Sequence, residues 1–424
     1  MAKLLQKIVN RLKRFLGQTI PYNLHYRPKG TYTTSEEFYH SHSTATEYVS
    51  LYPALTTRLK VPEHLYKSLS PYKVYDGDIA DEPCTLVVKT NYHVVKVPKG
   101  RIYTDNVGTI AIITEDNRVV NDVSFQYYPG KASAAPVNAV FRQKYFKEPV
   151  RYKGTVFTAV TGGGAVHNYG HWLIDVLPRI YLLKESGLFN TVDWFMVPNY
   201  QHDYHKESLK LLGIDESKII NAQLVHHVRA DAIIASTAPR GEHSFLIPDW
   251  VTNLHRKYLL TSEVLDDKPY PALVYISRKD SNLRKVTNED IVIDVLKLHG
   301  FESILSSKLS FKEKINLFYK AKVIVSASSA GLGSLFYANP ECKVLEIFSQ
   351  GFVHTHYYNM AYSIGLDYHY LICKHPSPAT NGKQGEREDI TVDTDNLKHK
   401  VQAMLAATPK ASELVPGFMS RLYL

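Results

Sequence analysis

The sequence predicts an α/β protein with two units, each built on a parallel sheet, and a β-rich region before them. Strand-like and helix-like runs alternate from about residue 150 onward, and the alternation restarts after a polar linker near residues 261–270. Such alternation implies parallel strands with covering helices. At 424 residues the chain also exceeds the roughly 250 to 300 residues that one hydrophobic core usually serves, so more than one folded unit is expected.

The composition is that of a folded globular protein. It is 44% hydrophobic and 21% charged, without a long low-complexity tract. The three cysteines, Cys84, Cys342 and Cys373, form no CxxC motif, so they indicate neither a zinc site nor a disulfide framework and favour a reducing compartment. The net charge of +9 favours anionic partners.

Residues 1–17, MAKLLQKIVNRLKRFLG, have the pattern of a basic amphipathic helix. Their apolar residues fall within an arc of about 140°, and the lysines and arginines lie outside it. Such a helix can lie in an anionic membrane interface, but it lacks the roughly 20 apolar residues of a spanning helix and the cleavage site of a signal peptide. The alternative is a helix that packs on its own protein, which the pattern fits equally well.

The β-rich region is expected over residues 18–150. Residues 18–60 are rich in Tyr, Thr and Ser and are expected to wrap the surface. From about 85 to 130, short β-prone runs such as TLVVKT, HVVKV and TIAIITED are separated by Asn, Gly, Lys and Pro. This spacing is typical of antiparallel strands, so we expect an accessory β element here.

The first α/β unit is expected over residues 151–262 and the second over 270–375, with a helical extension over 376–424. In the first unit we expect strands at 156–160, 192–199, 218–225 and 230–236, and helices at 171–187, 205–213 and 250–260. In the second we expect strands at 272–278, 301–307, 322–328 and 343–348, and helices at 288–300, 310–321 and 331–338. Open parallel sheets bind ligands beyond the carboxyl ends of their strands.

The stretch TGGGAVHNYGHWLIDVLPR, residues 161–179, joins the first strand of this unit to a helix. Gly163 and Gly164 permit tight turns and close approach of the backbone to a ligand. His167 and Asn168 lie in the same loop, where ligand contacts are common and solvated side chains commoner still.

A helix that begins near Tyr169 places His171 and Asp175 on one face, with Trp172 beside them and Arg179 following. A histidine oriented by a carboxylate can remove a proton from a hydroxyl near neutral pH, whereas the alternative is a structural His–Asp pair. Pro178 is expected to kink this helix or to begin a new one.

Two more groups of residues lie at strand ends of the second unit. Arg278 and Arg284 follow one strand and suit a diphosphate, unless they belong to an ordinary solvated basic loop. The small residues after the strand at 322–328 let backbone and hydroxyl groups contact phosphate, and Glu346, expected at the end of the next strand, can accept hydrogen bonds from ribose hydroxyls. The alternative is a turn selected for packing; the small residues named as candidate contacts are Ser328, Ser329 and Gly331.

A resident metal is not expected. Asp76 with Asp78, and Asp393 with Asp395, form acidic triplets that are common in turns and lie away from the strand ends of the α/β units. His354 and His356 alternate as on a strand and are expected to face solvent.

Taken together and in order, the segments HNYGHWLIDVLPRIYLL, YISRKDSNLRKVTNE and AKVIVSASSAGLGSLFYANPECKVLEIF resemble glycosyltransferase family 61, and YYNMAYSIGLDYHYL follows more loosely. This family includes plant xylan transferases, protein O-GlcNAc transferases and bacterial capsule enzymes. The resemblance implies a GT-B-like fold of two facing Rossmann-like domains and inverting transfer from a nucleotide sugar, usually without a catalytic metal and with no other cofactor.

Matched by position, the family's His-Trp and following acidic residue fall on His171, Trp172 and Asp175. Its arginine pair falls on Arg278 and Arg284, and its last glutamate on Glu346. Where many members have His-Gly-Ala-Gly-Leu-Thr-Asn, this chain reads Ser-Ser-Ala-Gly-Leu-Gly-Ser over 328–334. Because the missing His and Asn leave the identity of the donor open, nucleotides other than UDP are included among the candidates.

The combined hypothesis is an inverting glycosyltransferase in which His171 or Asp175 is the base and the second unit holds the nucleotide sugar. The expected acceptor is a glycan or glycolipid in bacterial capsule or cell-surface polysaccharide synthesis. We expect a cytoplasmic enzyme on the inner face of the cell membrane, bound through residues 1–17, with self-association as one option. The alternatives are an inactive nucleotide- or glycan-binding module and, less favoured because the chain shows no nucleic-acid-binding motif, a basic nucleic-acid-binding protein.

Overall fold

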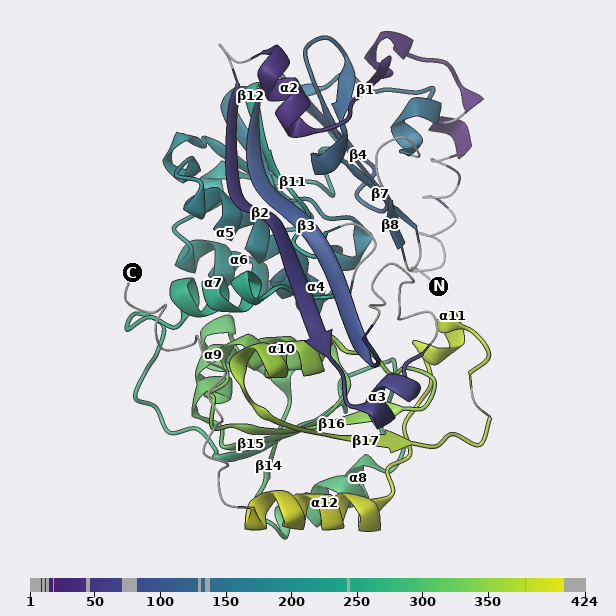
Figure 1. Ribbon diagram of the computed structural model, residues 1–424, viewed down its shortest axis with the longest axis vertical. Coiled ribbons are helices and arrows are strands. Elements are labelled where there is room, and N and C mark those ends of the chain that lie inside the picture. The colour runs from purple at the N-terminus through teal and green to yellow at the C-terminus, as the bar shows by residue number, and fades with distance from the viewer. Residues whose placement is uncertain are drawn as a thin grey trace. The chain divides into compact units, whose positions relative to one another are not determined.

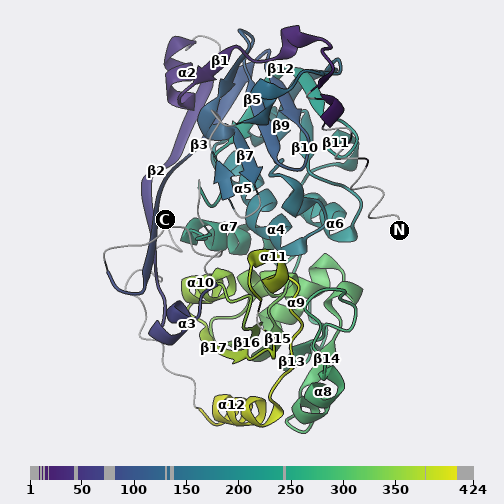
Figure 2. The same cartoon turned by 90° about the vertical axis from the view of Figure 1, so that its right-hand side faces the viewer.

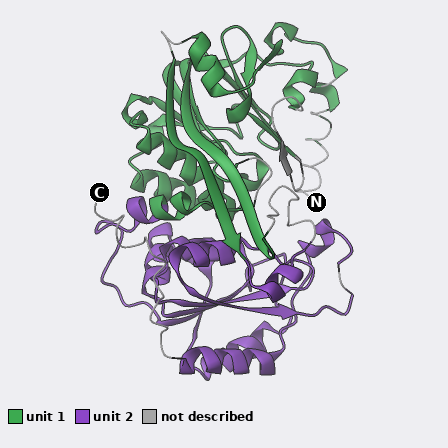
Figure 3. Cartoon of the chain, in the orientation of Figure 1, with its two compact units in different colours: residues 1–60, 75–254 green, residues 61–74, 255–424 purple. Residues whose placement is uncertain are grey.

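The computed structural model describes residues 9, 12, 15–17, 19–42, 46–70, 82–128, 131–133, 138–241, 245–377 and 379–407. Most of the helix predicted over 1–17 lies outside this range, as do Asp76, Asp78 and the end of the C-terminal extension. The chain forms two compact units (Figure 3), which comprise residues 1–60 with 75–254 and residues 61–74 with 255–424. The mixed α/β class with parallel strands is confirmed in both.

Unit 1 is built on one mixed sheet. Its strands are β1 (Gly30–Tyr32), β2 (Glu47–Lys60), β3 (Thr85–Pro98), β4 (Arg101–Thr104), β5 (Thr109–Ile113), β6 (Arg118–Val120), β7 (Phe125–Tyr128), β8 (Lys131–Ser133), β9 (Val150–Thr158), β10 (Trp194–Val197), β11 (Ile219–Asn221) and β12 (His227–Ser236). The main path runs β1-β6-β5-β4-β12-β9-β10-β11, and β2 and β3 form the long ribbon visible in Figure 1.

This sheet joins the two regions that the sequence separates at residue 150. Strands β12, β9, β10 and β11 are parallel neighbours, as the strand and helix alternation predicts. On its other side β12 pairs antiparallel with β3 and β4. The N-terminal strands therefore extend the sheet of the α/β region, and both share one hydrophobic core, to which Val95, Ile110, Val156 and Ile233 contribute.

The helices of this region are α2 (Ser35–Ser41), α4 (Tyr169–His171), α5 (Leu177–Glu185), α6 (Asp203–Leu211) and α7 (Asp249–Leu259), and the boundary between the two units falls within α7. A π-helical segment, Trp172–Val176, joins α4 to α5, and Pro178 stands in the first turn of α5. Proline has no N–H and its ring collides with the carbonyl four residues earlier. The Leu177 amide donates to the Trp172 carbonyl instead, so Pro178 begins a new helix, as predicted.

Unit 2 is a parallel sheet between two layers of helices. Its elements are α3 (Glu63–Lys67), β13 (Leu273–Ile276), α8 (Glu289–Lys297), β14 (Glu302–Ile304), α9 (Phe311–Lys320), β15 (Val323–Ala327), β16 (Lys343–Ser349), α10 (His356–Ile364), β17 (Asp367–Cys373), α11 (Gly382–Gly385) and α12 (Thr394–Ala406). The strand order is β14-β13-β15-β16-β17, all parallel. Helices α8 and α12 cover one face and α9 and α10 the other (Figures 1 and 2).

The predicted helix at 331–338 is a 3-10 helix, Ala330–Tyr337. The predicted strand at 218–225 ends at Asn221, where the chain turns. Within the described part of the chain, no helix has the length and apolar content needed to cross a membrane.

Candidate active site

Strand order decides which loops of unit 1 come together. β9 and β12 are parallel neighbours, so the loops that follow them emerge at the same edge of the sheet. The loop after β9 leads into α4, which carries His171, and the loop after β12 carries Arg240. Asp175, four residues after His171, and Arg240, 65 positions further along the chain, therefore meet at the carboxyl ends of two adjacent strands.

His171 and Asp175 form the pair that their spacing predicts. Nδ1 of His171 lies 2.7 Å from Oδ2 of Asp175. The Asn168 side chain caps the N-terminus of α4 by accepting a hydrogen bond from the His171 amide, at 3.2 Å. The His171 side chain is 35% exposed and that of Asp175 13%, so the histidine is the more accessible partner.

Arg240 is the third member of this cluster. Its Nε lies 2.8 Å from Oδ1 of Asp175 and its Nη2 lies 3.0 Å from Oδ2, a bidentate arrangement. Burial alone would raise the pKa of Asp175, but the Arg240 charge and the hydrogen bond from His171 outweigh it and hold the pKa well below its usual range. Asp175 is therefore ionised at neutral pH.

The charge on Asp175 determines the hydrogen-bonding state of His171. A carboxylate only accepts hydrogen bonds, so the His171 Nδ1 carries a hydrogen, and in the neutral ring Nε2 presents a lone pair. A Cβ added at Gly164 would lie 3.3 Å from this Nε2 and 3.2 Å from Cδ2. Gly164, predicted as an acceptor or cleft residue, therefore lies against the His171 ring.

The other predicted acceptor residues of unit 1 have different surroundings. The Gly163 amide donates to the Val107 carbonyl at 2.9 Å. The exposed His167 lies next to His202, with 3.2 Å between Nδ1 and Nε2. Trp172 is fully buried, and its indole N–H donates to the Ser208 hydroxyl at 2.9 Å.

Arg179 differs most from the expectation that it faces an acceptor. Its side chain is buried, and Nη1 donates to the Ser236 carbonyl, at the end of β12, over 2.7 Å. Burial lowers the pKa of its guanidinium to about 10. Arg179 and Trp172 thus support the helix from inside the core.

In unit 2, β13, β15 and β16 are neighbours, and the residues that follow β13 and β15 meet. Glu289 organises the end of β13, because its Oε1 accepts from the Ser277 hydroxyl at 2.8 Å and from the Arg278 amide at 2.6 Å. The Arg278 guanidinium holds the next loop: Nε donates to the Arg284 carbonyl at 3.1 Å and Nη2 to the Ser281 hydroxyl at 2.7 Å.

Arg284 connects this loop to the end of β15. Its Nε donates to the Ser328 carbonyl at 3.4 Å, Nη1 donates to the Glu386 carbonyl at 2.7 Å, and the guanidinium lies 4.5 Å from the Phe352 ring centroid. Burial and the neighbouring Arg284 charge lower the pKa of Arg278 to about 10. The two cations predicted to bind a diphosphate therefore lie close together.

The small-residue segment is more buried than a free binding loop. Ser328 and Ser329 are both buried, and the Ser328 hydroxyl lies 3.0 Å from Nε2 of His354. Gly331 is partly exposed, with Ile276 and Ser306 near it. His354 is buried and His356 begins α10, so the expectation of two solvent-facing histidines on a strand is wrong.

Glu346 lies in the middle of β16 and is fully buried, not at the strand end that the sequence suggests. Its Oε2 accepts from the Tyr368 hydroxyl at 2.6 Å, while Oε1 has no hydrogen-bond partner among the described residues. Burial raises its pKa to about 8, although the Tyr368 hydrogen bond and the Arg284 charge act in the opposite direction. Glu346 is therefore mostly neutral at pH 7.

Among the described residues, no three His, Cys, Asp or Glu side chains gather in a way that could hold a metal ion. Asp393 caps α12 by accepting from the Asn396 amide at 3.0 Å.

No curated protein matches the chain significantly. Among solved structures, the iron-containing dodecameric glycosyltransferase TibC from enterotoxigenic E. coli H10407 is 12% identical, with 64% of this chain and 80% of that chain covered and a TM-score of 0.26. The heptosyltransferase TibC in complex with ADP-D-β-D-heptose is 10% identical, with coverages of 60% and 75% and the same TM-score. A TM-score of 0.26 is too low to relate the folds.

The family model described as Glycosyltransferase 61 matches residues 169–345. This segment starts at the first residue of α4 and ends one residue before Glu346, so it contains the His171–Asp175–Arg240 cluster as well as Arg278 and Arg284. The resemblance drawn from the sequence motifs is thereby confirmed: residues 169–345 of the chain are similar to glycosyltransferase family 61.

Proposed function

We propose that the protein is an inverting glycosyltransferase that moves a sugar from a nucleotide sugar to a hydroxyl of a glycan or lipid-linked acceptor. The match to the family model supports glycosyl transfer itself. The observation that carries the mechanism is the hydrogen-bonded series Arg240–Asp175–His171, which ends at a partly exposed imidazole ring. The same three groups supply what direct displacement requires of a base.

On the acceptor side, His171 removes the proton of the acceptor hydroxyl, and Asp175 orients the His171 ring. Nε2 takes the hydroxyl proton as the acceptor oxygen attacks the anomeric carbon, and the imidazolium that forms is stabilised by the Asp175 carboxylate. Asp175 is a poor base itself, because Arg240 occupies both carboxylate oxygens and keeps its pKa low. Of the two candidates from the sequence, we therefore propose His171 as the base.

On the donor side, Arg278 and Arg284 stabilise the nucleoside diphosphate that leaves. Negative charge develops on the leaving oxygen during displacement, and two cations at a strand end suit it. Because Glu346 is mostly neutral, it does not compete with the diphosphate for these cations. A GT-B arrangement, no resident metal and a role in bacterial capsule or surface polysaccharide synthesis complete the proposal, on the strength of the family resemblance alone.

The proposal predicts that a nucleotide sugar stabilises the protein against heat. A screen of UDP, GDP, CMP and dTDP sugars by thermal shift identifies the donor, because a ligand that binds only the native state raises the melting temperature. Arg278→Gln should lose the response to the donor that the native chain binds. If no donor shifts the melting temperature of the native chain, the transferase proposal is weakened and a binding module for other ligands is favoured.

The second prediction concerns the base. His171→Ala and Asp175→Asn should each lower the rate of transfer by about 10²- to 10⁴-fold, the usual contribution of a positioned base. The thermal shift with the donor should persist in both, since the donor contacts lie in unit 2.

His40→Ala is the matched control, because His40 forms a helical pair with Glu36, with 4.0 Å between Nε2 and Oε1, on an exposed surface of α2. Full transfer by His171→Ala would refute the assignment of the base. Loss of donor binding in both variants would show that His171 and Asp175 belong to the donor site.

The third prediction follows from the raised pKa of Glu346. In the folded chain this carboxyl keeps its proton to about pH 8, whereas in the unfolded chain it ionises near pH 4.5. Its contribution to stability is complete below pH 4.5 and is lost as the pH rises toward 8, by at most about 1.4 kcal/mol per pH unit.

Glu346→Gln should therefore become more stable relative to the native chain as the pH rises from 5 to 8, which melting temperatures across this range measure. Glu302→Gln, at an exposed position of β14 in the same sheet, should show no such trend. A constant difference between Glu346→Gln and the native chain at all pH values would show that Glu346 is ionised when folded.

We also propose that the N-terminal segment binds an anionic membrane surface. Of its described residues, Leu12 is 55% exposed and Phe15 is 64% exposed, so both apolar residues keep more than half of their surface exposed. The alternative of a helix buried against its own chain is disfavoured for these positions.

Deletion of residues 1–17 should abolish sedimentation with liposomes that contain anionic lipid, and liposomes of purely zwitterionic lipid should bind neither form. The donor thermal shift serves as the folding control. Equal binding of both forms to anionic liposomes would contradict the membrane proposal.

A further inference from the structure

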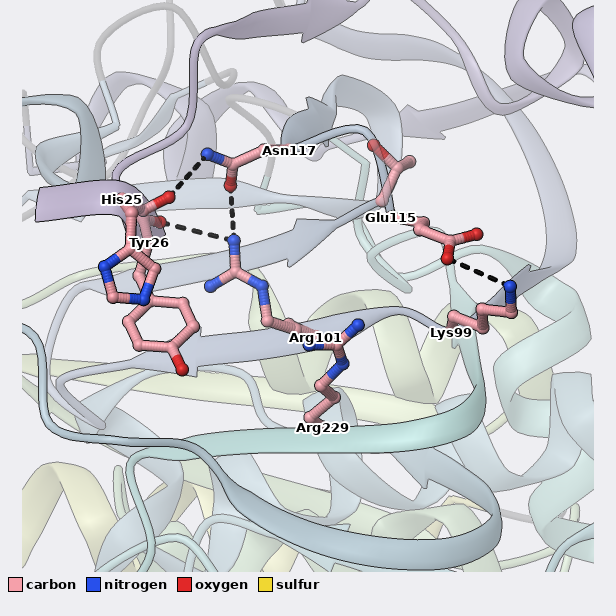
Figure 4. A pocket seen from close by; sticks show the side chains of 8 residues that line it. His25, Tyr26, Lys99, Arg101, Glu115, Asn117 and Arg229 are labelled. Carbon is pink, nitrogen blue, oxygen red and sulfur yellow. Dashed lines mark hydrogen bonds and ion pairs between the residues drawn. The ribbon is translucent and has the colours of Figure 1, made fainter. Parts of the chain in front are cut away.

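A charged cavity lies in unit 1 (Figure 4), built by strands and turns of the N-terminal β region together with β12. Its volume is about 160 Å³. Its lysine, arginine and glutamate side chains are those of Lys99, Arg101, Glu115 and Arg229. The complete lining is His25, Tyr26, Lys99, Arg101, Thr114, Glu115, Asn117 and Arg229. Most of these residues lie outside the segment matched by the family model.

Arg101 is the most buried cation of this cavity, with 6% of its surface exposed. All its hydrogen-bond partners are neutral in form: Nη1 lies 2.9 Å from Nε2 of His227, and Nη2 donates to the Tyr26 carbonyl at 3.3 Å and to the Asn117 side-chain oxygen. The His227 Nδ1 donates to the Lys147 carbonyl at 2.7 Å, so Nε2 is the acceptor. Burial lowers the pKa of His227 to about 4, which keeps the ring uncharged.

A second arginine stands directly opposite the first. β4 pairs antiparallel with β12, and Arg101 and Arg229 are Cα partners in this pairing. On its other side β12 pairs with β9, where Arg229 is the partner of Arg151. Residues opposite one another on neighbouring strands point to the same face, so three arginines form a row across three strands.

The row lacks acidic partners. Neither Arg229 nor Arg151 makes a side-chain hydrogen bond or ion pair with any residue that the structure describes. Glu115 is the carboxylate among the lining residues, and it is paired with Lys99 at 3.0 Å. The nearby Glu148 accepts from the Tyr26 hydroxyl at 2.5 Å and from the Asn23 amide at 3.0 Å.

This arrangement is unfavourable for the isolated chain. Like charges directly opposite in a sheet are destabilising, and a cation withdrawn from water without a counter-charge is more so. Burial and then the Arg229 charge lower the pKa of Arg101 to about 10, as expected for a cation beside another cation. An anion between the guanidinium groups would remove both penalties.

We propose that this cavity is a binding site for a phosphate group, held by Arg101 and Arg229. Two guanidinium groups offer several N–H donors in the planar arrangement that phosphate oxygens match. The volume is well below the roughly 300 to 1,000 Å³ of sites that enclose a whole drug-sized ligand. The site therefore takes inorganic phosphate, or the phosphate end of a phosphorylated glycan whose remainder lies outside.

Calorimetric titration of the full chain, at low ionic strength, with inorganic phosphate and with a hexose phosphate tests the site. We expect saturable binding that Arg229→Gln weakens about tenfold or more, since a hydrogen bond to a charged group has about this effect. Arg118→Gln is the control, because Arg118 is an exposed arginine of β6, paired with Asp116. It should bind as the native chain does.

A folding readout accompanies the titration. Without phosphate, Arg229→Gln should melt at the same temperature as the native chain or higher, because it loses the repulsion from Arg101, and phosphate should no longer raise its melting temperature. Tighter binding of the hexose phosphate identifies a glycan-borne phosphate as the ligand, and equal binding identifies free phosphate. Absence of saturable binding, or binding that Arg229→Gln leaves intact, overturns the proposal.

Discussion

The site of unit 1 depends on the ion pair between Asp175 and Arg240. A largely buried carboxylate persists in its ionised form only beside a counter-charge, and Arg240 contacts both of its oxygens. The pairing of β9 with β12 places the two residues at one sheet edge. The ionised Asp175 then determines which nitrogen of His171 carries a hydrogen, so the chemistry proposed for the ring derives from the strand order.

Two buried carboxyl groups in this chain take opposite ionisation states, because their hydrogen-bond partners differ. Asp175 has a bidentate guanidinium and is ionised, whereas Glu346 receives one hydroxyl hydrogen bond, has an oxygen without a partner, and is mostly neutral. Each state serves the proposed reaction. An ionised Asp175 stabilises a protonated histidine, and a neutral Glu346 leaves the positive charge of Arg278 and Arg284 available to a diphosphate.

Local patterns predicted much of this structure. The alternation after residue 150 identified the parallel strands, and the four-residue spacing of His171 and Asp175 predicted their contact, because both depend on neighbours in the chain. Arg240 was not predicted as a site residue, because its contact with Asp175 depends on strand order. The Pro-Arg-Gly sequence after a strand-like run was a usable signal for it. The burial of Arg179 and the mid-strand place of Glu346 also depend on long-range packing, which spacing alone does not encode.

The same dependence applies to the row of arginines. Arg101, Arg151 and Arg229 are far apart in the chain, and the pairing of β12 with both β4 and β9 aligns them. A sheet that only had to be stable would gain from a carboxylate or a neutral residue at one of these places, because the row repels itself. The net charge of +9 is thus partly concentrated where a bound anion would relieve it, which separates this cavity from ordinary solvated basic surface.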